Sequence, residues 1–322
     1  MMKNNPWKDL TKTVNTKRCD PANKFDFYWG INQNGEYLFL IEHQNFEDWS
    51  AKQLSFSEIN IEHYQLKSGY RVLLTLKNLN DWDIFYTLCN DLLTLSLEVD
   101  TEKTLLTMIH NRLQRWQKMF RKTGKKILTE QEQQGLIGEL IFIKNYLFKL
   151  YSSQTALLFW KGPLGEQQDF GIGNTSIEIK TKLGTSSSNI QISSIEQLDF
   201  RTKYAFLFVL TLTCSSLESD SFTLNSLIND IKQQIEDYDS LELFESLLLE
   251  LGYIELPEYS EKQYIINKES FYEVKNDFPR LTISNIPNGI NSIQYSIDLK
   301  SCSNYLIDNN SFTKRILDDR PA

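Results

Sequence analysis

Hydrophobic and polar positions alternate along the first hundred residues in short runs separated by turns, the pattern of β-strands with one buried face. Four such runs are rich in aromatic and aliphatic residues: 25–30, 36–42, 59–65 and 70–77. The first two flank a loop that ends in Asn34-Gly35, a pair typical of hairpins. Helical patterns follow at 79–97 and 101–122. We therefore expect residues 1–100 to form a β-rich α+β region.

Another helix signal lies at 129–132, where Thr-Glu-Gln-Glu forms a capping box. Apolar residues then cover most of the helix circumference, which predicts a buried helix. This helix carries Glu139, and Gly135 and Gly138 allow the close approach of another backbone. A buried carboxylate needs a cation, a metal or a proton. The alternative is that Glu139 reaches solvent at the edge of the apolar stripe.

Strand and helix patterns alternate after this helix, which is the order of an α/β core. Residues 175–182 alternate with period two, 189–192 form a further strand, and the nearly continuous apolar run 203–213 suits the middle of a sheet. Between the last two strands, a second capping box at 193–196 opens a short helix. We expect residues 101–215 to be this core, a mixed sheet flanked by helices.

The remaining residues, 216–322, show two helical patterns followed by short strands and turns. The expected helices are 222–236 and 241–251, and the expected strands are 263–266, 271–275, 281–284 and 293–300. We interpret this region as an appended α+β segment. The predicted fold class is therefore α/β, with a β-rich segment before the core and an α+β segment after it.

Composition excludes several classes of protein. The chain has 322 residues, of which 41% are hydrophobic and 24% charged, a balance typical of globular proteins. Four cysteines without a C-x-x-C pair and three histidines without an H-E-x-x-H pattern argue against a zinc site. No glycine-rich nucleotide-binding loop is present. The polar N-terminus and the shortness of the apolar runs predict a cytoplasmic protein with no membrane partner.

The formal net charge of -8 argues at first against binding of nucleic acid. Between residues 230 and 278, however, 13 acids stand against four bases, whereas the rest of the chain holds 30 bases and 29 acids. The acidity therefore belongs to one segment. We expect this segment to face solvent or a basic partner, away from a nearly neutral core.

One stretch of the chain is strongly basic, with eight Lys or Arg and no acid between residues 103 and 129. Four of these cations share one face of the helix expected at 101–122: Arg112, Arg115, Lys118 and Lys122. Such a stripe can follow a phosphate backbone, although charged runs are usually plain solvated faces. We take these four residues, together with Lys182, as candidate DNA contacts.

The strongest chemical signal is Asp169, followed after eight residues by Glu178-Ile179-Lys180. Mg²⁺ prefers hard oxygen ligands and keeps several waters, so two carboxylates can hold it and leave room for a phosphate. Lys180 leaves the expected strand on the same face as Glu178 and can orient a water or stabilise the transition state. The alternative is a solvated strand face with cross-strand charge pairs. Gln197 either touches this site or only caps its helix.

Two similar tripeptides lack this context. Glu273-Val274-Lys275 also lies in an expected strand, but its surroundings are strongly acidic and no Asp lies close upstream. Asp230-Ile231-Lys232 lies in a helical pattern, where the acid and the lysine point in different directions. Only the first candidate combines an upstream Asp, an alternating strand and a preceding buried helix with a glutamate.

With these residues, the sequence resembles the PD-(D/E)XK nuclease superfamily, and more closely a bacterial family of PD-(D/E)XK-motif proteins of poorly defined role. The resemblance rests on segments 135–140, 160–163, 169–170, 177–180, 192–194, 197–198, 278–281 and 286–290. It implies a restriction-endonuclease-like core and phosphodiester hydrolysis with Mg²⁺, for which Mn²⁺ can substitute. Asp169 and Glu178 would bind the metal, Lys180 would be catalytic, and Glu139 would be the helix-borne acid that assists them. Gln168 stands where the superfamily has proline.

The sequence therefore predicts a metal-dependent DNA endonuclease, and the resemblance implies a place beside DNA methyltransferases and ATPases in restriction or antiphage loci. Two alternatives stay open. One is a catalytically inactive DNA-binding or scaffolding subunit of a defence complex, and the other is a protein-interaction module that uses the acidic C-terminal segment. Cutting both strands would be compatible with a homodimer, although no interface is legible in the sequence.

Overall fold

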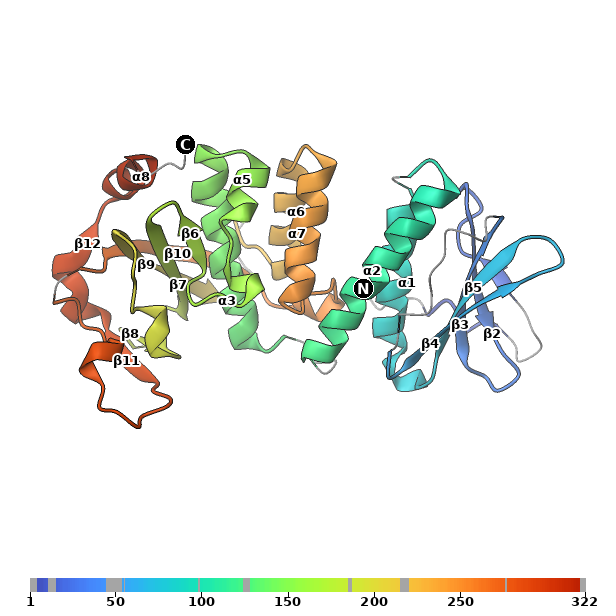
Figure 1. The fold of residues 1–322 in the computed structure, drawn as a ribbon, viewed down its shortest axis with the longest axis horizontal. Coiled ribbons are helices and arrows are strands. Elements are labelled where there is room, and N and C mark those ends of the chain that lie inside the picture. The colour runs from blue at the N-terminus through green and yellow to red at the C-terminus, as the bar shows by residue number, and fades with distance from the viewer. Residues whose placement is uncertain are drawn as a thin grey trace. The chain divides into compact units, whose positions relative to one another are not determined.

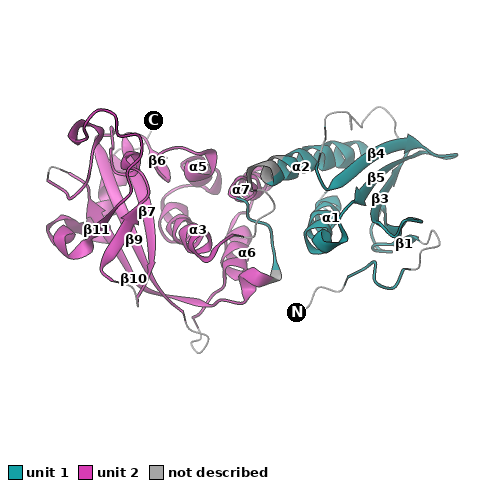
Figure 2. Cartoon of the chain, turned by 90° about the horizontal axis from the view of Figure 1, so that it is seen from below, with its two compact units in different colours: residues 1–126, 252–257 teal, residues 127–251, 258–322 magenta. Residues whose placement is uncertain are grey.

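The computed structural model describes residues 5–10, 16–44, 54, 56–97, 99–123, 128–184, 187–214, 220–275 and 277–318, with only the backbone at 118, 119, 121–123 and 257. The chain divides into two compact units (Figure 2). Unit 1 comprises residues 1–126 and 252–257, and unit 2 comprises residues 127–251 and 258–322. This division differs from the three expected regions, because the basic helix belongs to unit 1 and the C-terminal segment to unit 2.

Unit 1 is an antiparallel sheet covered by two helices. Its strands are β1 (Thr16–Arg18), β2 (Asp26–Ile31), β3 (Tyr37–His43), β4 (Ile59–Gln65) and β5 (Tyr70–Leu76), in the order β1-β2-β3-β5-β4. The helices are α1 (Trp82–Ser96) and α2 (Glu102–Thr123). Both helices lie on one face of this sheet (Figure 1). The four expected strands and the two expected helices are confirmed.

Unit 2 is built on a five-stranded mixed sheet. Its strands are β6 (Phe170–Ile172), β7 (Thr175–Leu183), β9 (Tyr204–Cys214), β10 (Tyr264–Glu273) and β12 (Leu306–Ile307), in the order β12-β10-β9-β7-β6. The pair β7 and β9 is parallel, and the other pairs are antiparallel. The apolar run of β9 lies in the middle of the sheet, as its composition predicts. A mixed α/β fold is therefore confirmed.

The C-terminal segment is part of this sheet rather than an appendage, which corrects the sequence interpretation. The two short strands expected in residues 263–275 are one strand, β10, that pairs with β9 along its length. The register shifts between Ile266 and Lys268, where exposed polar residues interrupt the apolar pattern. Because this irregularity breaks the period-two alternation, the sequence pattern predicts two strands where the structure has one.

Helices cover one face of the unit 2 sheet (Figure 2). They are α3 (Glu130–Phe142), a π-helical turn (Ile143–Leu147), α4 (Phe148–Leu150), α5 (Ser153–Leu158), α6 (Leu224–Gln234), α7 (Tyr238–Glu250) and, nearer the C-terminus, α8 (Asn309–Asp318). The capping box at the start of α3 forms as predicted. A Cβ atom at Gly138 would lie only 2.1 Å from Thr181 Oγ1 and 3.0 Å from Ile179 Cγ2. Glycine at this position therefore lets α3 pack directly on β7.

A two-stranded ribbon covers the opposite face of the sheet. It pairs β8 (Asn189–Ile192) with β11 (Tyr295–Asp298), and its apolar side chains share a core with β9 and β10. Two expectations in this layer are wrong. The capping box at 193–196 does not form, since a 3-10 turn spans Ile195–Gln197 and Ser194 makes no side-chain cap. The strand expected at 281–284 is replaced by a 3-10 turn at Ile283–Asn285.

Among the helices that the structure describes, none combines the length and the apolar character needed to cross a bilayer.

Candidate active site

A tight hairpin brings Asp169 and Glu178 together. Strands β6 and β7 pair antiparallel, with Phe170 opposite Ile177, and the turn between them contains Gly173 at φ 55°. Extending this register by one residue sets Asp169 opposite Glu178. Asp169 Oδ2 also accepts a hydrogen bond of 2.7 Å from the backbone N–H of Ile179. The eight-residue gap in the sequence is therefore the length of this hairpin.

Lys180 lies between an acid and an amide. Its Nζ is 2.9 Å from Glu178 Oε1 and donates a 2.9 Å hydrogen bond to Gln197 Oε1. The same amide oxygen accepts a hydrogen bond from the backbone N–H of Ser193. Gln197 therefore both holds its own turn and touches the site, whereas the sequence left these roles as alternatives.

Glu178 is almost completely buried, with 1% of its side chain exposed. Its Oε2 atom accepts no hydrogen bond from any residue within the described part of the chain. A buried carboxylate oxygen without a partner is costly, because it has lost water and gained nothing in exchange. This atom is therefore the point in the site at which a cation or a proton fits best.

Glu139 faces the same site from α3, which packs on the sheet through Gly138. Its Oε2 accepts a 2.5 Å hydrogen bond from the indole N–H of Trp160. A Cβ atom at Gly162 would lie 3.0 Å from Glu139 Oε2 and 3.3 Å from Asp169 Oδ1, so both carboxylates converge on this glycine. The backbone N–H groups of Lys161 and Gly162 donate to the Asp169 carbonyl and fix this turn. Glu139 therefore points into the site rather than out to solvent.

The carboxylates outnumber the cation that faces them. Burial raises the pKa of Asp169 to about 6, although the Ile179 N–H and the charge of Lys180 oppose this rise. Burial, followed by the charge of Asp169, raises the pKa values of Glu139 and Glu178 well above their usual range. Three acids with one lysine leave excess negative charge in a dry site, which a proton or a cation must balance.

The donor atoms suit a hard divalent cation such as Mg²⁺ or Mn²⁺, since they are carboxylate oxygens and no His or Cys joins them. Within the described ranges, no group of three His, Cys, Asp or Glu side chains already stands in an arrangement ready to hold a metal. The unpartnered oxygen of Glu178 and the convergence of Glu139 and Asp169 on Gly162 nevertheless fit such an ion. Asp169 and Glu178, with Glu139 beside them, are the residues that would bind it.

The candidate DNA contacts are divided between the two units. Arg112 is 6% exposed, and its Nε lies 3.6 Å from Asp91 Oδ2, so it cannot share an exposed stripe with the other cations of α2. Arg115 is half-buried, and the side chains of Lys118 and Lys122 lie outside the described residues. These four residues belong to unit 1, whereas the acids belong to unit 2. Only Lys182, on β7, follows Lys180 on the same strand face, and its Nζ donates to the Ser187 carbonyl.

Sequence reasoning missed Trp160 and Gly162 as neighbours of the acids, and it missed β6 as a strand. The signal for β6 was present in Gly173-Asn174, a pair that commonly closes two-residue hairpins. The contact between Trp160 and Glu139 had no such local signal, because it joins a residue of α3 to one that follows α5 and bridges to Phe170.

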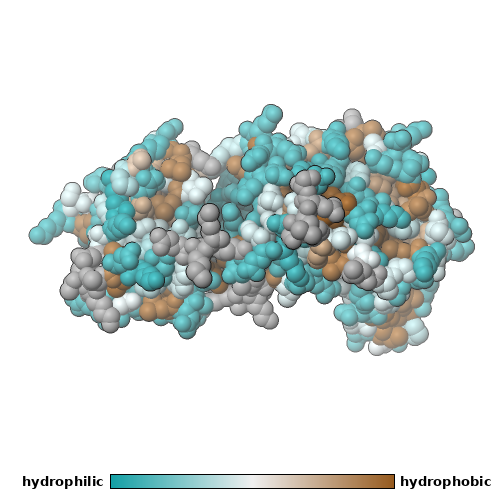
Figure 3. Space-filling view, turned by 180° about the vertical axis from the view of Figure 1, so that it is seen from behind, coloured by the Kyte–Doolittle hydropathy of each residue, from teal (hydrophilic) through white to brown (hydrophobic). Residues whose placement is uncertain are grey.

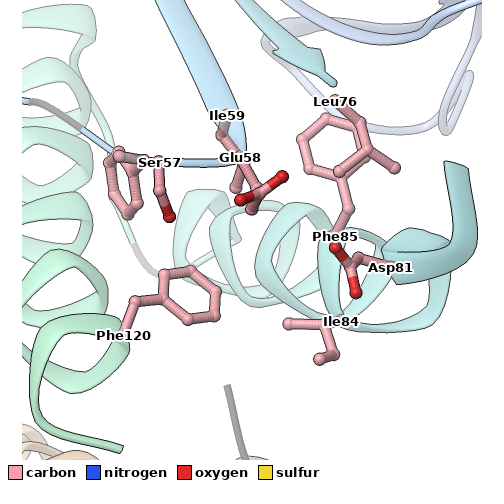
Figure 4. A pocket seen from close by; sticks show the side chains of 9 residues that line it. Ser57, Glu58, Ile59, Leu76, Asp81, Ile84, Phe85 and Phe120 are labelled. Carbon is pink, nitrogen blue, oxygen red and sulfur yellow. The ribbon is translucent and has the colours of Figure 1, made fainter. Parts of the chain in front are cut away.

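A separate pocket lies in unit 1 (Figure 4). It is mainly apolar, and the residues that line it are Phe56, Ser57, Glu58, Ile59, Leu76, Asp81, Ile84, Phe85 and Phe120. None of the acids of the hairpin site contributes to it. The pocket therefore does not extend the chemistry of unit 2.

Comparison with known proteins gives one match. A family model described as "Putative PD-(D/E)XK family member, (DUF4420)" matches residues 3–300. No curated protein and no solved structure matches the chain.

Proposed function

The chain belongs to this family of PD-(D/E)XK members, and from that premise we propose that it is a metal-dependent DNA endonuclease with a restriction-endonuclease-like core in unit 2. The single observation that supports this proposal most directly is the hairpin of β6 and β7. It holds Asp169, Glu178 and Lys180 at one point, with Glu139 facing them. Carboxylates that can bind a divalent metal, beside a lysine, are a residue set suited to phosphodiester hydrolysis.

In this mechanism Asp169 and Glu178 would hold the metal, and Glu139 would complete the site directly or through water. The metal, when bound, supplies charge stabilisation for the phosphate and lowers the pKa of a water. Lys180 positions the attacking water and stabilises charge that develops on the phosphate. Gln197 fixes the direction of the Lys180 ammonium through the 2.9 Å hydrogen bond. Glu139 keeps its orientation through Trp160.

Incubation of plasmid and linear DNA with Mg²⁺ or Mn²⁺ tests this proposal. Wild-type protein should cleave both substrates, whereas Lys180→Ala and Asp169→Ala should not. Cleavage of closed circular plasmid distinguishes an endonuclease from an enzyme that needs ends. Unchanged cleavage by both variants would overturn the assignment of the site.

One observation favours a second candidate, a catalytically inactive DNA-binding or scaffolding subunit. Lys180 already neutralises one oxygen of Glu178, and no three-ligand group stands ready within the described residues. This candidate predicts DNA binding that persists in EDTA and in Glu178→Ala, with no cleavage by any metal. Methyltransferase or ATPase partners and a defence role are expectations that rest on the resemblance alone. A cytoplasmic location is an expectation from the pattern of the sequence, and homodimerisation is one from the need to cut both strands.

A further inference from the structure

The loop between β10 and β11 has a composition unlike that of its surroundings. Residues 279–294, here called the finger loop, contain no Asp or Glu and a single cation, Arg280. The preceding residues 230–278 hold 13 acids. The finger loop is instead rich in Asn, Gln, Ser and Thr, side chains that hydrogen-bond to phosphates and to base edges. Its composition is therefore compatible with a polyanion, whereas that of the adjoining segment is not.

The finger loop projects from the body of unit 2. Figure 1 shows it below β11, and Figure 3 shows hydrophobic atoms on the lobe that projects at the lower right. Ile283 is 53% exposed and Ile290 is 47% exposed. Gly289 adopts φ 96°, and a Cβ atom there would meet no other atom within 4 Å. The tip of the loop therefore presents apolar side chains and amides to the surroundings.

The base of the finger loop is tied to the acidic hairpin site. Arg280 Nη1 donates a 2.5 Å hydrogen bond to the Leu198 carbonyl, next in the chain to Gln197, which holds Lys180. The backbone N–H of Leu281 donates to the hydroxyl of Tyr295 at 3.3 Å. The first residues of the loop therefore contact Leu198, the residue that follows Gln197, and the Gln197 side chain orients Lys180.

The loop and Lys180 also share one face of the sheet. Ile179 and Thr181 face α3 through Gly138, so the alternation of β7 directs Glu178 and Lys180 toward the β8 and β11 ribbon. Burial raises the pKa of Tyr295, the Leu281 N–H and the charge of Arg280 oppose this rise, and the charges of Asp199 and then Glu178 add to it. The Tyr295 hydroxyl is therefore within electrostatic reach of both the site and the base of the loop.

We infer that the finger loop is a DNA-contacting element that flanks the cleavage site. In this inference, which rests on the proposed endonuclease function, Arg280 contacts a phosphate next to the scissile one. The amides of the tip contact base edges or sugars, and Ile283 and Ile290 pack against the groove. The absence of acids follows, because a carboxylate here would repel the backbone. The loop would thus determine which sequence or DNA shape is placed over Lys180.

The first test measures DNA affinity by fluorescence anisotropy and cleavage rate for Arg280→Ala and for the double variant Ile283→Ser/Ile290→Ser. Each should bind DNA at least about tenfold more weakly, and Arg280→Ala should reduce the salt slope of binding by about one. Arg280→Lys should retain part of the affinity because it keeps the charge. Matched controls are Lys314→Ala, which removes an exposed cation of α8, and Leu158→Ser, which removes a leucine that is 56% exposed. Both should bind like wild type.

A second test does not depend on the stability of those variants. A photocrosslinker attached to Asn288→Cys in a Lys180→Ala background should join to DNA, whereas one attached to Leu158→Cys should not. Normal binding and cleavage by all finger-loop variants, with no crosslink at Asn288, would overturn the inference while leaving the endonuclease intact. Wild-type protein that neither binds nor cleaves DNA would overturn both. A crosslink to a protein partner in place of DNA would also overturn it.

Discussion

Two strands of the same sheet carry the same pattern, Glu-X-Lys, with different surroundings. Glu178-Ile179-Lys180 lies in β7, and Glu273-Val274-Lys275 lies at the end of β10. Both glutamates are buried, with 1% and 6% of the residue exposed. Each lies beside the lysine two positions later. Neither the tripeptide nor its burial therefore distinguishes the two places.

The difference lies in charge balance. Glu273 has a cation at each oxygen, Lys275 at Oε2 and Arg315 at Oε1. Glu178 has one cation, a second acid across the hairpin and a third from α3, and its Oε2 has no partner among the described residues. A satisfied ion pair holds a helix to a sheet, whereas an unbalanced cluster of acids can recruit a metal. The surroundings, and not the tripeptide, determine the chemistry.

The largest effect should separate the two lysines. Lys180→Ala should lower the rate of DNA cleavage by at least about 10³-fold, because it removes charge stabilisation in the transition state. Lys275→Ala should leave the rate within about twofold, since the Lys275 side chain is half exposed and β9 lies between its strand and the hairpin. Single-turnover cleavage of one plasmid at saturating protein measures both. Similar losses in the two variants would show that the comparison is wrong.

A second experiment replaces each of the two glutamates with glutamine. Glu178→Gln should weaken binding of Mg²⁺ or Mn²⁺ by at least about 100-fold, because even outer-shell partners of a metal can contribute this much. Glu273→Gln should leave metal affinity unchanged. It should instead lower the free energy of unfolding by about 1–2 kcal/mol, because Lys275 and Arg315 lose the negative charge and one of the two acceptor oxygens that face them. Isothermal titration with the metal and chemical denaturation measure the two quantities. Loss of metal binding in Glu273→Gln would contradict the charge-balance argument.

The excess of acids at the hairpin site should also make the stability of the protein depend on pH. The pKa of Asp169 is raised from 3.8 to about 6 in the folded state. Its contribution to stability is therefore fully present below pH 3.8 and is lost as the pH rises through 6. Relative to Asp169→Asn, the metal-free wild type should lose stability across this window, by a few degrees in Tm.

Added Mg²⁺ should raise the Tm of the wild type more at pH 7.5 than at pH 5, since the acids must lose their protons to bind it. Differential scanning calorimetry at the two pH values, with and without Mg²⁺, measures this effect. Asp169→Asn is the control, and an equal Mg²⁺ effect at both pH values would argue against a metal held by these acids.

The smallest effect should come from Gln197. Gln197→Ala should lower kcat by about tenfold, because Lys180 keeps its pair with Glu178 but loses the hydrogen bond that sets its direction. KM should change little. Gln197→Glu can still accept from Lys180 and should restore part of kcat. A change confined to KM would place Gln197 in substrate binding rather than in the orientation of Lys180.

The sequence predicts the local parts of the site well, because caps and strand alternation are signals carried by neighbouring residues. The capping box of α3 and the alternation of β7 are both visible in the sequence. Of the two glycines expected at a close approach, Gly138 is confirmed, whereas a Cβ atom at Gly135 would meet no other atom within 4 Å. The three-residue strand β6 was too short to show a period. The sequence predicts an exposed Arg112, because nothing near it in the chain indicates its pairing with Asp91, which lies on α1.

The order of the strands could not be read from the sequence, because it depends on pairing between distant segments. The polar interruption in β10 divided one strand into two apparent ones, and the acidic segment therefore looked separate from the core. The charge counts also suggest that this acidic segment is separate from the core. Glu273, one of those acids, lies inside the sheet with its cations.

The position of β9 has a consequence for synthesis of the chain on the ribosome. Its two neighbours are β7, made before it, and β10, whose last residue is Glu273. Until that residue emerges, one edge of β9 has no partner strand, and an open apolar edge invites pairing with other chains. The ribbon partner β11 and the finger loop come later still. We therefore expect a nascent chain to complete the acidic hairpin site and its surroundings only after β10, the finger loop and β11 have all emerged, and termination before Glu273 to yield an aggregation-prone fragment.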